Sequence, residues 1–254
     1  MMQTPFSLKG KNILVSGASS GIGRQCAIDF SFNGANVFLL GRNVEELEKT
    51  KELCSQDVVI KYFSLDFSAL DSIKTEVEAI CDEVGLVHGY LHAAGIEKSL
   101  PYLHLKKEDY QRLYDVNFIS AMEILKVISN KRYRGDKAKY VLVSSITAVI
   151  GRPTVAAYAA SKGAMVSAVK SLSLELAKKG VCINCISPGT ILTPMMIKVL
   201  DSMTEEQRKA REESFPLGFG EPSDISNAAV FLLSNAARWI TGQNIIIDGG
   251  YTAH

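Results

Sequence analysis

The sequence has no excess of charge of either sign. Lysines and arginines total 28, aspartates and glutamates total 27, and the formal net charge is +1. A chain with so balanced a charge exerts little long-range attraction on nucleic acids or on anionic membrane surfaces. We therefore expect no nucleic-acid partner and no membrane partner.

Long apolar runs and a secretion signal are also absent. No apolar stretch approaches the ~20 residues that a membrane span requires. The first residues, MMQTPFSLKGK, lack the apolar core of a signal peptide. The five cysteines form an odd set, which argues for reduced thiols rather than a disulfide framework. Together these features predict a cytoplasmic protein.

Candidate metal ligands are scarce. The four histidines, His88, His92, His104 and His254, show no metal-binding spacing. Cys182 and Cys185 have the spacing of a redox or zinc motif, but they lie in an apolar segment that reads as a strand. A redox pair of this spacing begins a helix, and zinc needs a second pair of ligands. We therefore expect no metal site.

Short apolar segments and helical segments alternate along the whole sequence. The 254 residues are 47% hydrophobic and 22% charged, which suits one well-packed domain, and we find no repeat or linker. Such alternation favours a parallel, doubly wound sheet with helices on both faces. The predicted strands are 11–17, 36–40, 58–63, 86–93, 140–144, 181–186 and 244–247. The prediction is one seven-stranded α/β domain over residues 1–254, whose halves are residues 1–135 and 136–254.

The first predicted strand ends in a glycine-rich turn, residues 17–23, that leads into a helical segment. Gly17 allows a tight turn, Gly21 lets the backbone approach a pyrophosphate, and Gly23 lets the helix pack on the strand. The helix N-terminus attracts the anion. Glycine also marks plain turns, and the spacing differs from the commoner G-x-G-x-x-G. In its strand–turn–helix context the motif nevertheless predicts dinucleotide binding and a Rossmann fold.

The ends of the second and third strands indicate which dinucleotide binds. NAD enzymes usually place an acidic residue after the second strand, whereas this chain has Gly41 and Arg42 there. Arg42 suits a 2′-phosphate, although it could also be a solvated loop residue. Asp66 follows the third strand and could accept a hydrogen bond from an adenine amino group, or simply cap a helix. We expect NADP(H) to be preferred, with NAD(H) as a possible cofactor.

A tyrosine and a lysine stand four positions apart after the central apolar strand. On a helix, Tyr158 and Lys162 would share one face. A nearby cation can lower a phenol pKa from ~10 by ~1–3 units, which prepares Tyr158 to donate and accept a proton. Ser145 could hydrogen-bond the same substrate oxygen. Alone, Tyr-x-x-x-Lys is weak evidence, since an ordinary helix face often carries both residues.

Together these features resemble the short-chain dehydrogenase/reductase family. The resemblance rests on SGASSGIG at 16–23, Ser145, Tyr158-x-x-x-Lys162 and Pro188-Gly189, in that order. It implies hydride transfer between a nicotinamide cofactor and a carbonyl or alcohol, with Tyr158 as acid or base and Ser145 polarising the substrate oxygen. Ser145 stands 13 residues before Tyr158, the usual family spacing, and is preferred over Ser144.

The resemblance implies roles for further residues. Lys162 would depress the pKa of Tyr158 and hold the nicotinamide ribose, and Asn117 would position a proton-relay water. The implied cofactor-binding set is Gly17, Ser19, Ser20, Gly21, Ile22, Gly23, Arg42, Asn43, Asp66, Phe67, Ala94, Gly95, Tyr158, Lys162, Ile191 and Thr193.

The sequence departs from the family pattern in three places. Ser16 replaces the usual Thr and keeps its hydroxyl. His92-Ala93-Ala94-Gly95 replaces the usual Asn-Asn-Ala-Gly, which removes two amides that brace the sheet or the cofactor. An arginine often found in the stretch corresponding to 216–222 is absent. The change at 92–95 is expected to affect local geometry more than chemistry.

A long segment, residues 191–220, interrupts the alternation and is predicted to be a lid over the cleft. Its Met195, Met196, Leu200 and Phe215 suggest a partly apolar substrate. Within the family, the length, lid and C-terminal segment resemble 3-oxoacyl-(acyl carrier protein) reductases. Basic residues that such enzymes often carry have counterparts in Arg134, Lys137 and Lys179. The substrate would then be a small carbonyl or alcohol compound, with acyl carrier protein as a possible partner.

Two other functions stay open, and an oligomer is expected. The chain could be an NAD-linked dehydrogenase of a hydroxysteroid, sugar or polyol, or a dinucleotide-binding sensor or scaffold without turnover. The predicted helices 107–129 and 157–178 carry more apolar positions than one sheet-facing stripe needs. On this basis and on the family resemblance we expect a homo-oligomer, a tetramer.

Overall fold

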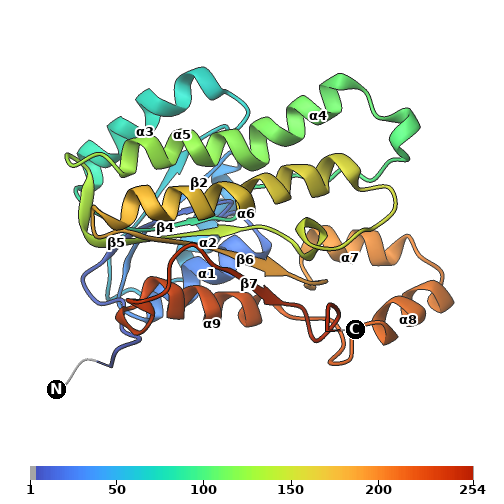
Figure 1. Cartoon of the computed structure of the whole chain (residues 1–254). Coiled ribbons are helices and arrows are strands. Elements are labelled where there is room, and N and C mark those ends of the chain that lie inside the picture. Colours follow the sequence, from blue (N-terminus) through green and yellow to red (C-terminus); the bar gives the residue numbers. More distant parts are fainter. Residues whose placement is uncertain (1–3, 254) are drawn as a thin grey trace.

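The computed structural model describes residues 4–253, which form a single sheet covered by helices (Figure 1). The strands are β1 Asn12–Ser16, β2 Asn36–Gly41, β3 Ile60–Ser64, β4 Val87–His92, β5 Arg134–Val143, β6 Cys182–Pro188 and β7 Asn244–Ile247. They lie in the order β3-β2-β1-β4-β5-β6-β7, and every neighbouring pair is parallel. The predicted seven-stranded, doubly wound sheet is confirmed.

The strands are apolar on both faces because both faces are covered. In β1, Ile13 and Val15 belong to one core and Leu14 to the other, and all three are fully buried. A parallel sheet enclosed in this way needs continuous apolar runs rather than alternating polar and apolar residues. This is the physical reason that short apolar runs in the sequence predicted the strands.

The helices divide between the two faces. One face is covered by α1 Gly21–Phe32, α2 Val44–Leu53 and α9 Pro222–Leu233, and the other by α3 Leu70–Val84, α5 Ser120–Ile128 and α6 Ala156–Ala177. The first group contributes Phe30, Leu47 and Ile225 to the core that contains Val15. Short 3₁₀ turns span Tyr102–His104, Ile146–Ala148 and Asn235–Ala237. Among residues 4–253, no helix has both the length and the apolar character that crossing a membrane requires.

The parallel arrangement brings the predicted site residues to one edge of the sheet. Gly17, Arg42, Ala93 and Ser144 each follow directly after a strand, at its carboxyl end. The chain winds outward from β1 in one direction and from β4 in the other, so a crevice opens between them at this edge. The edge is therefore where a dinucleotide site belongs.

The predicted helix 107–129 is interrupted at a position that matters. It consists of α4 Lys107–Tyr114, one π-helical turn Asp115–Ile119, and α5. The π-helical turn contains Asn117. Such turns are rare and occur often at functional sites, and the sequence carries no local signal for this one.

One strand boundary was predicted wrongly. The strand predicted at 140–144 begins earlier, because β5 starts at Arg134, which pairs with Val87 of β4. The polar residues that begin this strand concealed it in the sequence. The helix α9 begins at Pro222, and its N-cap is Glu221. The Asp224 carboxylate accepts a hydrogen bond from the Glu221 N–H at 2.7 Å.

The segment predicted as a lid contains two short helices. These are α7 Pro194–Asp201 and α8 Glu205–Glu213, which project beyond the carboxyl edge of the sheet (Figure 1). Leu200 and Phe215 are buried, and Phe215 packs against Tyr251 at 4.5 Å between ring centroids. Met195 and Met196 line the cleft described below, so only these two of the four apolar lid residues named above reach it.

Candidate active site

A cleft of about 300 Å³ lies at the carboxyl edge of the sheet. It runs from the glycine-rich turn to the lid and is lined by residues that follow β1 to β6. The structure places these predicted cofactor residues in its wall: Gly17, Ser19, Ser20, Gly21, Ile22, Gly23, Arg42, Asp66, Phe67, Ala94, Gly95, Tyr158, Lys162, Ile191 and Thr193. Ser145 also lines the cleft, whereas Asn117 lies behind it and Asn43 lines a neighbouring hollow.

Two glycines of the turn leave no room for a side chain. Gly17 has a φ of +68°, and a Cβ there would lie 2.7 Å from the Ala93 carbonyl carbon. A Cβ on Gly23 would lie 2.2 Å from the Gly17 oxygen. These positions need glycine because backbone packs directly on backbone. The turn thus leads into the N-terminus of α1 with its N–H groups beside the cleft, as anion binding requires.

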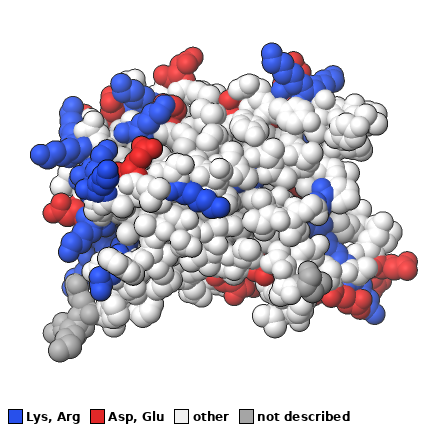
Figure 2. All heavy atoms as spheres, viewed as in Figure 1, with Lys and Arg blue, Asp and Glu red and all other residues white. Residues whose placement is uncertain are grey.

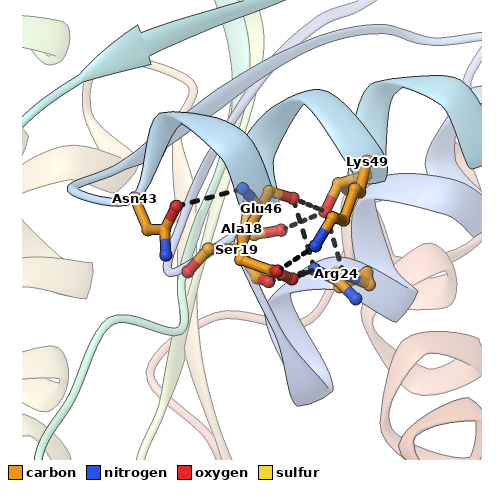
Figure 3. A network of polar contacts seen from close by, with 7 residues as sticks. Ala18, Ser19, Arg24, Asn43, Glu46 and Lys49 are labelled. Atoms are coloured by element: carbon orange, nitrogen blue, oxygen red, sulfur yellow. Dashed lines mark hydrogen bonds and ion pairs between the residues drawn. The ribbon is translucent and has the colours of Figure 1, made fainter.

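An arginine beside the turn holds it to the next helix, and the sequence analysis did not identify it (Figure 3). Arg24 donates a hydrogen bond to the Ser19 carbonyl and pairs with the Glu46 carboxylate at 2.5 Å. Its Nε donates to the Thr50 hydroxyl at 2.9 Å, and Thr50 donates to the Ala18 carbonyl at 2.9 Å. The only signal in the sequence was an arginine directly after the last motif glycine.

The neighbouring hollow lies beside the second strand. Ser19, Arg42, Asn43, Val44 and Glu45 line it. The Arg42 side chain is exposed, and the structure shows no ion pair for it within residues 4–253. Asn43 caps α2 by accepting a hydrogen bond from the Glu46 N–H at 3.1 Å. The start of α2 and a free guanidinium therefore face the same hollow, and both attract an anion.

Asp66 and Phe67 form the wall at the end of β3. The Asp66 carboxylate accepts hydrogen bonds from the Ser68 N–H at 2.9 Å and the Ser68 hydroxyl at 2.7 Å, and these lower the pKa of Asp66. Asp66 is therefore an ionised acceptor at neutral pH. The Phe67 ring is buried and packs edge-on against His92, with 6.3 Å between ring centroids.

Lys162 and Tyr158 of α6 meet in the cleft on one helix face, as their spacing predicts. The Lys162 ammonium donates to the Val143 carbonyl at 2.9 Å and lies 5.9 Å from the centre of the Tyr158 ring. Burial lowers the pKa of Lys162 to about 8. Burial raises the pKa of Tyr158, and Glu97 adds to this effect, whereas Ser145 and Arg152 oppose it.

The expected lowering of the Tyr158 pKa is therefore not seen in this structure. The Lys162 ammonium is directed at a carbonyl of β5, and removal of the phenolate from water dominates. The phenol stays protonated at neutral pH, which is the form that donates a proton.

Ser145, not Ser144, presents its hydroxyl to the cleft. The Ser145 oxygen accepts hydrogen bonds from the Thr147 N–H at 3.2 Å and the Thr147 hydroxyl at 3.0 Å. Both lone pairs are thereby engaged, and its own proton is left to donate. The Ser144 hydroxyl is buried and donates to the Lys162 carbonyl at 2.9 Å.

Asn117 is fully buried, and its side chain joins the segment that follows β4 to helix α6. Its amide oxygen accepts from the Ile96 N–H at 2.8 Å, and its amide nitrogen donates to the Ile96 carbonyl at 3.0 Å and the Ser161 hydroxyl at 2.9 Å. A Cβ on Gly95 would lie 3.2 Å from the Lys162 ammonium and 3.3 Å from the Asn117 amide oxygen. The glycine thus keeps a gap open between these two polar groups.

The lid reaches the glycine turn through its first residues. Ile191 is buried and forms an isolated bridge with Gly220. The Thr193 hydroxyl caps α7 by accepting from the Met196 N–H at 3.3 Å, and its methyl group would lie 3.1 Å from a Cβ on Gly21. The start of the lid and the glycine-rich turn therefore lie close together in the wall of the cleft.

Comparison with known proteins decides the family. A family model described as enoyl-(acyl carrier protein) reductase matches residues 17–252. The chain belongs to the short-chain dehydrogenase/reductase family. It is 33% identical over 250 residues to the 3-oxoacyl-(acyl-carrier-protein) reductase FabG of Rickettsia felis, and the matched region covers 96% of this chain and 98% of the relative. It is also 33% identical over 261 residues to the glucose 1-dehydrogenase of Gluconobacter oxydans, covering 100% and 97% of the two chains.

Solved structures of the family share the fold closely. A putative short-chain alcohol dehydrogenase from Sinorhizobium meliloti has a TM-score of 0.91 at 28% identity, covering 98% of this chain and 99% of that one. A putative 2-deoxy-d-gluconate 3-dehydrogenase from Agrobacterium tumefaciens with bound NADP has a TM-score of 0.89 at 29% identity, covering 99% and 100%. The protein is a short-chain NAD(P)-dependent dehydrogenase/reductase.

Proposed function

We propose that this enzyme reduces a carbonyl group to a secondary alcohol with NADPH. The observation that carries the proposal is the convergence of Ser145, Tyr158 and Lys162 on one cleft whose far end holds the glycine turn and Arg42. A dinucleotide-binding sensor without turnover has no use for a protonated phenol and an oriented serine hydroxyl at the same point. The convergence therefore argues against the sensor.

Tyr158 and Ser145 have different roles at the substrate oxygen. A bound nicotinamide would supply the hydride to the carbonyl carbon. The Tyr158 phenol donates the proton to the oxygen, and the Ser145 hydroxyl, oriented by Thr147, stabilises the developing negative charge. We expect Lys162 to bind the ribose hydroxyls and to pass a proton toward the phenol, and Asn117 lies across the gap beside Gly95 from it.

The preference for NADPH is supported by the charges around the second hollow. The Glu46 carboxylate, in the first turn of α2, is paired with both Arg24 and Lys49, which reduces its repulsion of a phosphate. Arg42 forms no ion pair with any residue in 4–253 and supplies attraction, and its planar fork suits phosphate oxygens. Glu45 on the rim weakens this attraction but is exposed to solvent. The NADP-bound relative described above is consistent with this preference.

A second candidate, the dehydrogenation of a sugar or related polyol, is supported by charges near Tyr158. Glu97 raises the pKa of the Tyr158 phenol, and Arg152 lowers it. Arg211 of the lid is half-buried, and its guanidinium donates a hydrogen bond to the Thr190 hydroxyl at 3.2 Å. Charged groups at this end of the cleft suit a polar substrate. The glucose 1-dehydrogenase relative agrees with this reading.

The proposal of an acyl carrier protein partner rests on the FabG relatives rather than on the basic residues. Arg134 and Lys137 begin β5, and Lys179 precedes β6, so all three lie at the amino edge of the sheet. Figure 2 shows basic side chains gathered at that end of the molecule. A carrier protein docked there would not reach the cleft of the same subunit, because the cleft lies at the opposite edge.

We also propose that the enzyme is a homo-oligomer, a tetramer. Large apolar side chains are exposed beside α6 and β7: Trp239 is 88% exposed, Leu174 74% and Ile246 40%. Burying them between subunits would stabilise an assembly. Light scattering should give a mass near four times that of the 27.7 kDa chain, and a mass near one chain would contradict the proposal.

A substrate panel tests the function. The enzyme is offered NADPH with a 3-oxoacyl thioester, a keto-sugar, a diketone and a steroid ketone, and loss of absorbance of the reduced nicotinamide is followed. Turnover of the thioester favours the leading proposal, and turnover of the keto-sugar alone favours the second candidate. If none is reduced, and none of the corresponding alcohols is oxidised, the proposed reaction is wrong.

A further inference from the structure

A carboxylate without a partner lies in the wall of the cleft. Glu97 lines the cleft together with Ser145 and Tyr158, and it is half-buried. Its carboxylate makes no hydrogen bond and no ion pair with any residue in 4–253. Burial, and then Glu97, raise the pKa of Tyr158, which agrees with a carboxylate close to the phenol. An acceptor that the protein itself leaves unpaired at this place points to a hydrogen-bond donor on the ligand.

The main chain on both sides of Glu97 is fixed to other elements. On one side, the Asn117 amide oxygen accepts from the Ile96 N–H at 2.8 Å, and its amide nitrogen donates to the Ile96 carbonyl at 3.0 Å. On the other side, the Lys98 ammonium pairs with the Asp109 carboxylate of α4 at 2.5 Å. The Glu97 side chain is therefore held at the cleft rather than left on a loose loop.

The next residues of the same segment are held by a strained threonine. Thr154 lies in the loop that precedes α6, and its φ of +69° is in the left-handed region that β-branched residues avoid. The Thr154 hydroxyl lies 2.6 Å from the Ser99 hydroxyl, and the Thr154 carbonyl accepts from the Leu100 N–H at 2.7 Å. Such a conformation is unfavourable, persists only where its surroundings impose it, and is concentrated at functional sites. Thr154 thus connects the loop before α6 to the segment that carries Glu97.

The charges at this end of the cleft narrow the class of ligand. The Arg211 guanidinium donates to the Thr190 hydroxyl at 3.2 Å, and the residues on either side of Thr190 line the cleft. Arg211 forms no ion pair with Glu97 or with any other residue in 4–253. A cationic ligand would be repelled by Arg211 and an anionic ligand by Glu97, whereas an apolar group would leave the carboxylate unpaired. A neutral hydroxyl group can donate to the carboxylate, and its oxygen can accept from a guanidinium.

We propose that Glu97 is a specificity-determining residue that accepts a hydrogen bond from a hydroxyl group of the substrate, and that Thr154 is the positioning residue that keeps it at the cleft. The substrate is then a hydroxylated ketone rather than a plain one. The hydrogen bond to Glu97 strengthens binding of such a ketone and holds its carbonyl group at Tyr158 and Ser145. This inference rests on the proposed function, because it names the substrate class of the reduction proposed above.

Matched substrates test Glu97. Reduction of cyclohexanone by NADPH is compared with reduction of each singly hydroxylated cyclohexanone. A hydrogen bond to a charged group is worth roughly tenfold in affinity at a partly exposed site, so the wild type should favour at least one hydroxylated ketone by about that factor in kcat/KM. Glu97→Ala should bring the ratio of the two kcat/KM values close to that of an enzyme without preference. Any effect of this variant on the phenol cancels in the ratio. Glu97→Gln should keep part of the preference, since an amide oxygen still accepts.

A glutamate away from the cleft supplies the matched control. Glu108 of α4 is exposed, forms no ion pair with any residue in 4–253 and does not line the cleft. Glu108→Ala removes the same charge from a nearby element and should leave both the ratio and the rates unchanged. A ratio that falls equally in Glu97→Ala and Glu108→Ala would show a general effect of charge and would overturn the role of Glu97.

Two variants test Thr154 as a positioning residue. Ser99→Ala removes the contact between the hydroxyls alone, and Thr154→Gly removes it together with the strain, because glycine adopts a positive φ freely. We expect both to lower the preference for the hydroxylated ketone by about threefold, through KM rather than kcat, as for part of one hydrogen bond. Thr154→Gly should nevertheless unfold at no lower urea concentration than the wild type. A preference that is intact in both variants would overturn the positioning role.

Binding measurements keep the test independent of turnover. With NADP⁺ present, ligand-observed NMR compares the cyclohexanediols with cyclohexanol, in the wild type and in Glu97→Ala. We expect the tightest-binding diol to lose about tenfold in affinity in the variant, and cyclohexanol less than about twofold. Equal binding of the diols and cyclohexanol by the wild type, or a preference for the hydroxylated ketone that survives Glu97→Ala, would overturn the inference. If the wild type binds a diol preferentially but reduces none of the ketones, the proposed function is contradicted instead.

Discussion

The two ends of the cleft are built differently. At the cofactor end, backbone packs on backbone at Gly17 and Gly23, and Arg24 ties the turn to α2 through partly buried hydrogen bonds. At the substrate end, every residue of α8 is at least partly exposed, and its ion pair between Lys209 and Glu213 spans 3.9 Å. A cofactor end of this kind is preorganised, whereas α8 of the lid has no buried residue to fix it in place. The comparison explains why the reaction is easier to infer than the substrate.

The largest effect is expected where the two ends meet. Tyr158→Phe removes the hydroxyl that donates the proton and leaves the rest of the cleft wall unchanged. We expect kcat to fall by ~10²–10⁴-fold, the usual contribution of general acid–base catalysis. The affinity for NADPH, measured by calorimetry without substrate, should change less than about threefold. Turnover within a few-fold of wild type would remove Tyr158 from its role.

Two glycine-to-alanine substitutions compare the tightly packed turn with a helix position that has room for a side chain. Gly23→Ala places a Cβ 2.2 Å from the Gly17 oxygen, whereas nothing lies within 4 Å of a Cβ on Gly163 in α6. We expect Gly23→Ala to lower the free energy of unfolding by more than about 3 kcal/mol and to abolish NADPH binding. Gly163→Ala should be neutral or stabilising by ~0.5–1 kcal/mol. Equal effects in urea unfolding would show that the turn is not tightly packed.

Acid should destabilise the rigid end through His92. Its pKa is lowered from 6.5 to about 3 in the folded protein, so the unfolded chain binds the extra proton between these values. The stability from this group is present above pH 6.5 and is lost as pH falls toward 3, by roughly 3 kcal/mol at about pH 4. Urea unfolding should show a loss from pH 7 to pH 4 that is smaller in His92→Asn. The exposed His104→Asn serves as control, and an equal loss in all three proteins would contradict this account.

The smallest effect is expected in the lid. Lys209→Ala breaks an ion pair whose two side chains are 76% and 68% exposed. Exposed pairs contribute little, so the free energy of unfolding should change by less than ~0.5 kcal/mol. KM for NADPH should stay the same. A change above about 1 kcal/mol would show that α8 is held more firmly than its exposure indicates.

The same contrast separates what the sequence predicted from what it did not. Apolar runs and glycines are local signals, so the strands and the positions of Ser145, Tyr158 and Lys162 in the cleft followed from spacing and family resemblance. The Arg24 network and the contact between His92 and Ser16 depend on side chains from separate elements, which no local pattern records. The start of β5 was missed because its residues are polar, and the π-helical turn at Asn117 because the sequence carries no local signal for it. The roles of the site residues remain predictions until the variants are measured.

The most direct test concerns the hollow beside β2, where the cofactor end is expected to select its ligand. NADPH and NADH are titrated calorimetrically into the wild type and into Arg42→Ala, without substrate and at low salt. A charged hydrogen bond contributes ~1.5–3 kcal/mol, and since Arg42 is exposed we expect the lower end, roughly tenfold. The account predicts that the wild type binds NADPH more tightly by that factor and that Arg42→Ala weakens NADPH alone. Tighter binding of NADH by the wild type, or an equal loss for both cofactors in the variant, would contradict it.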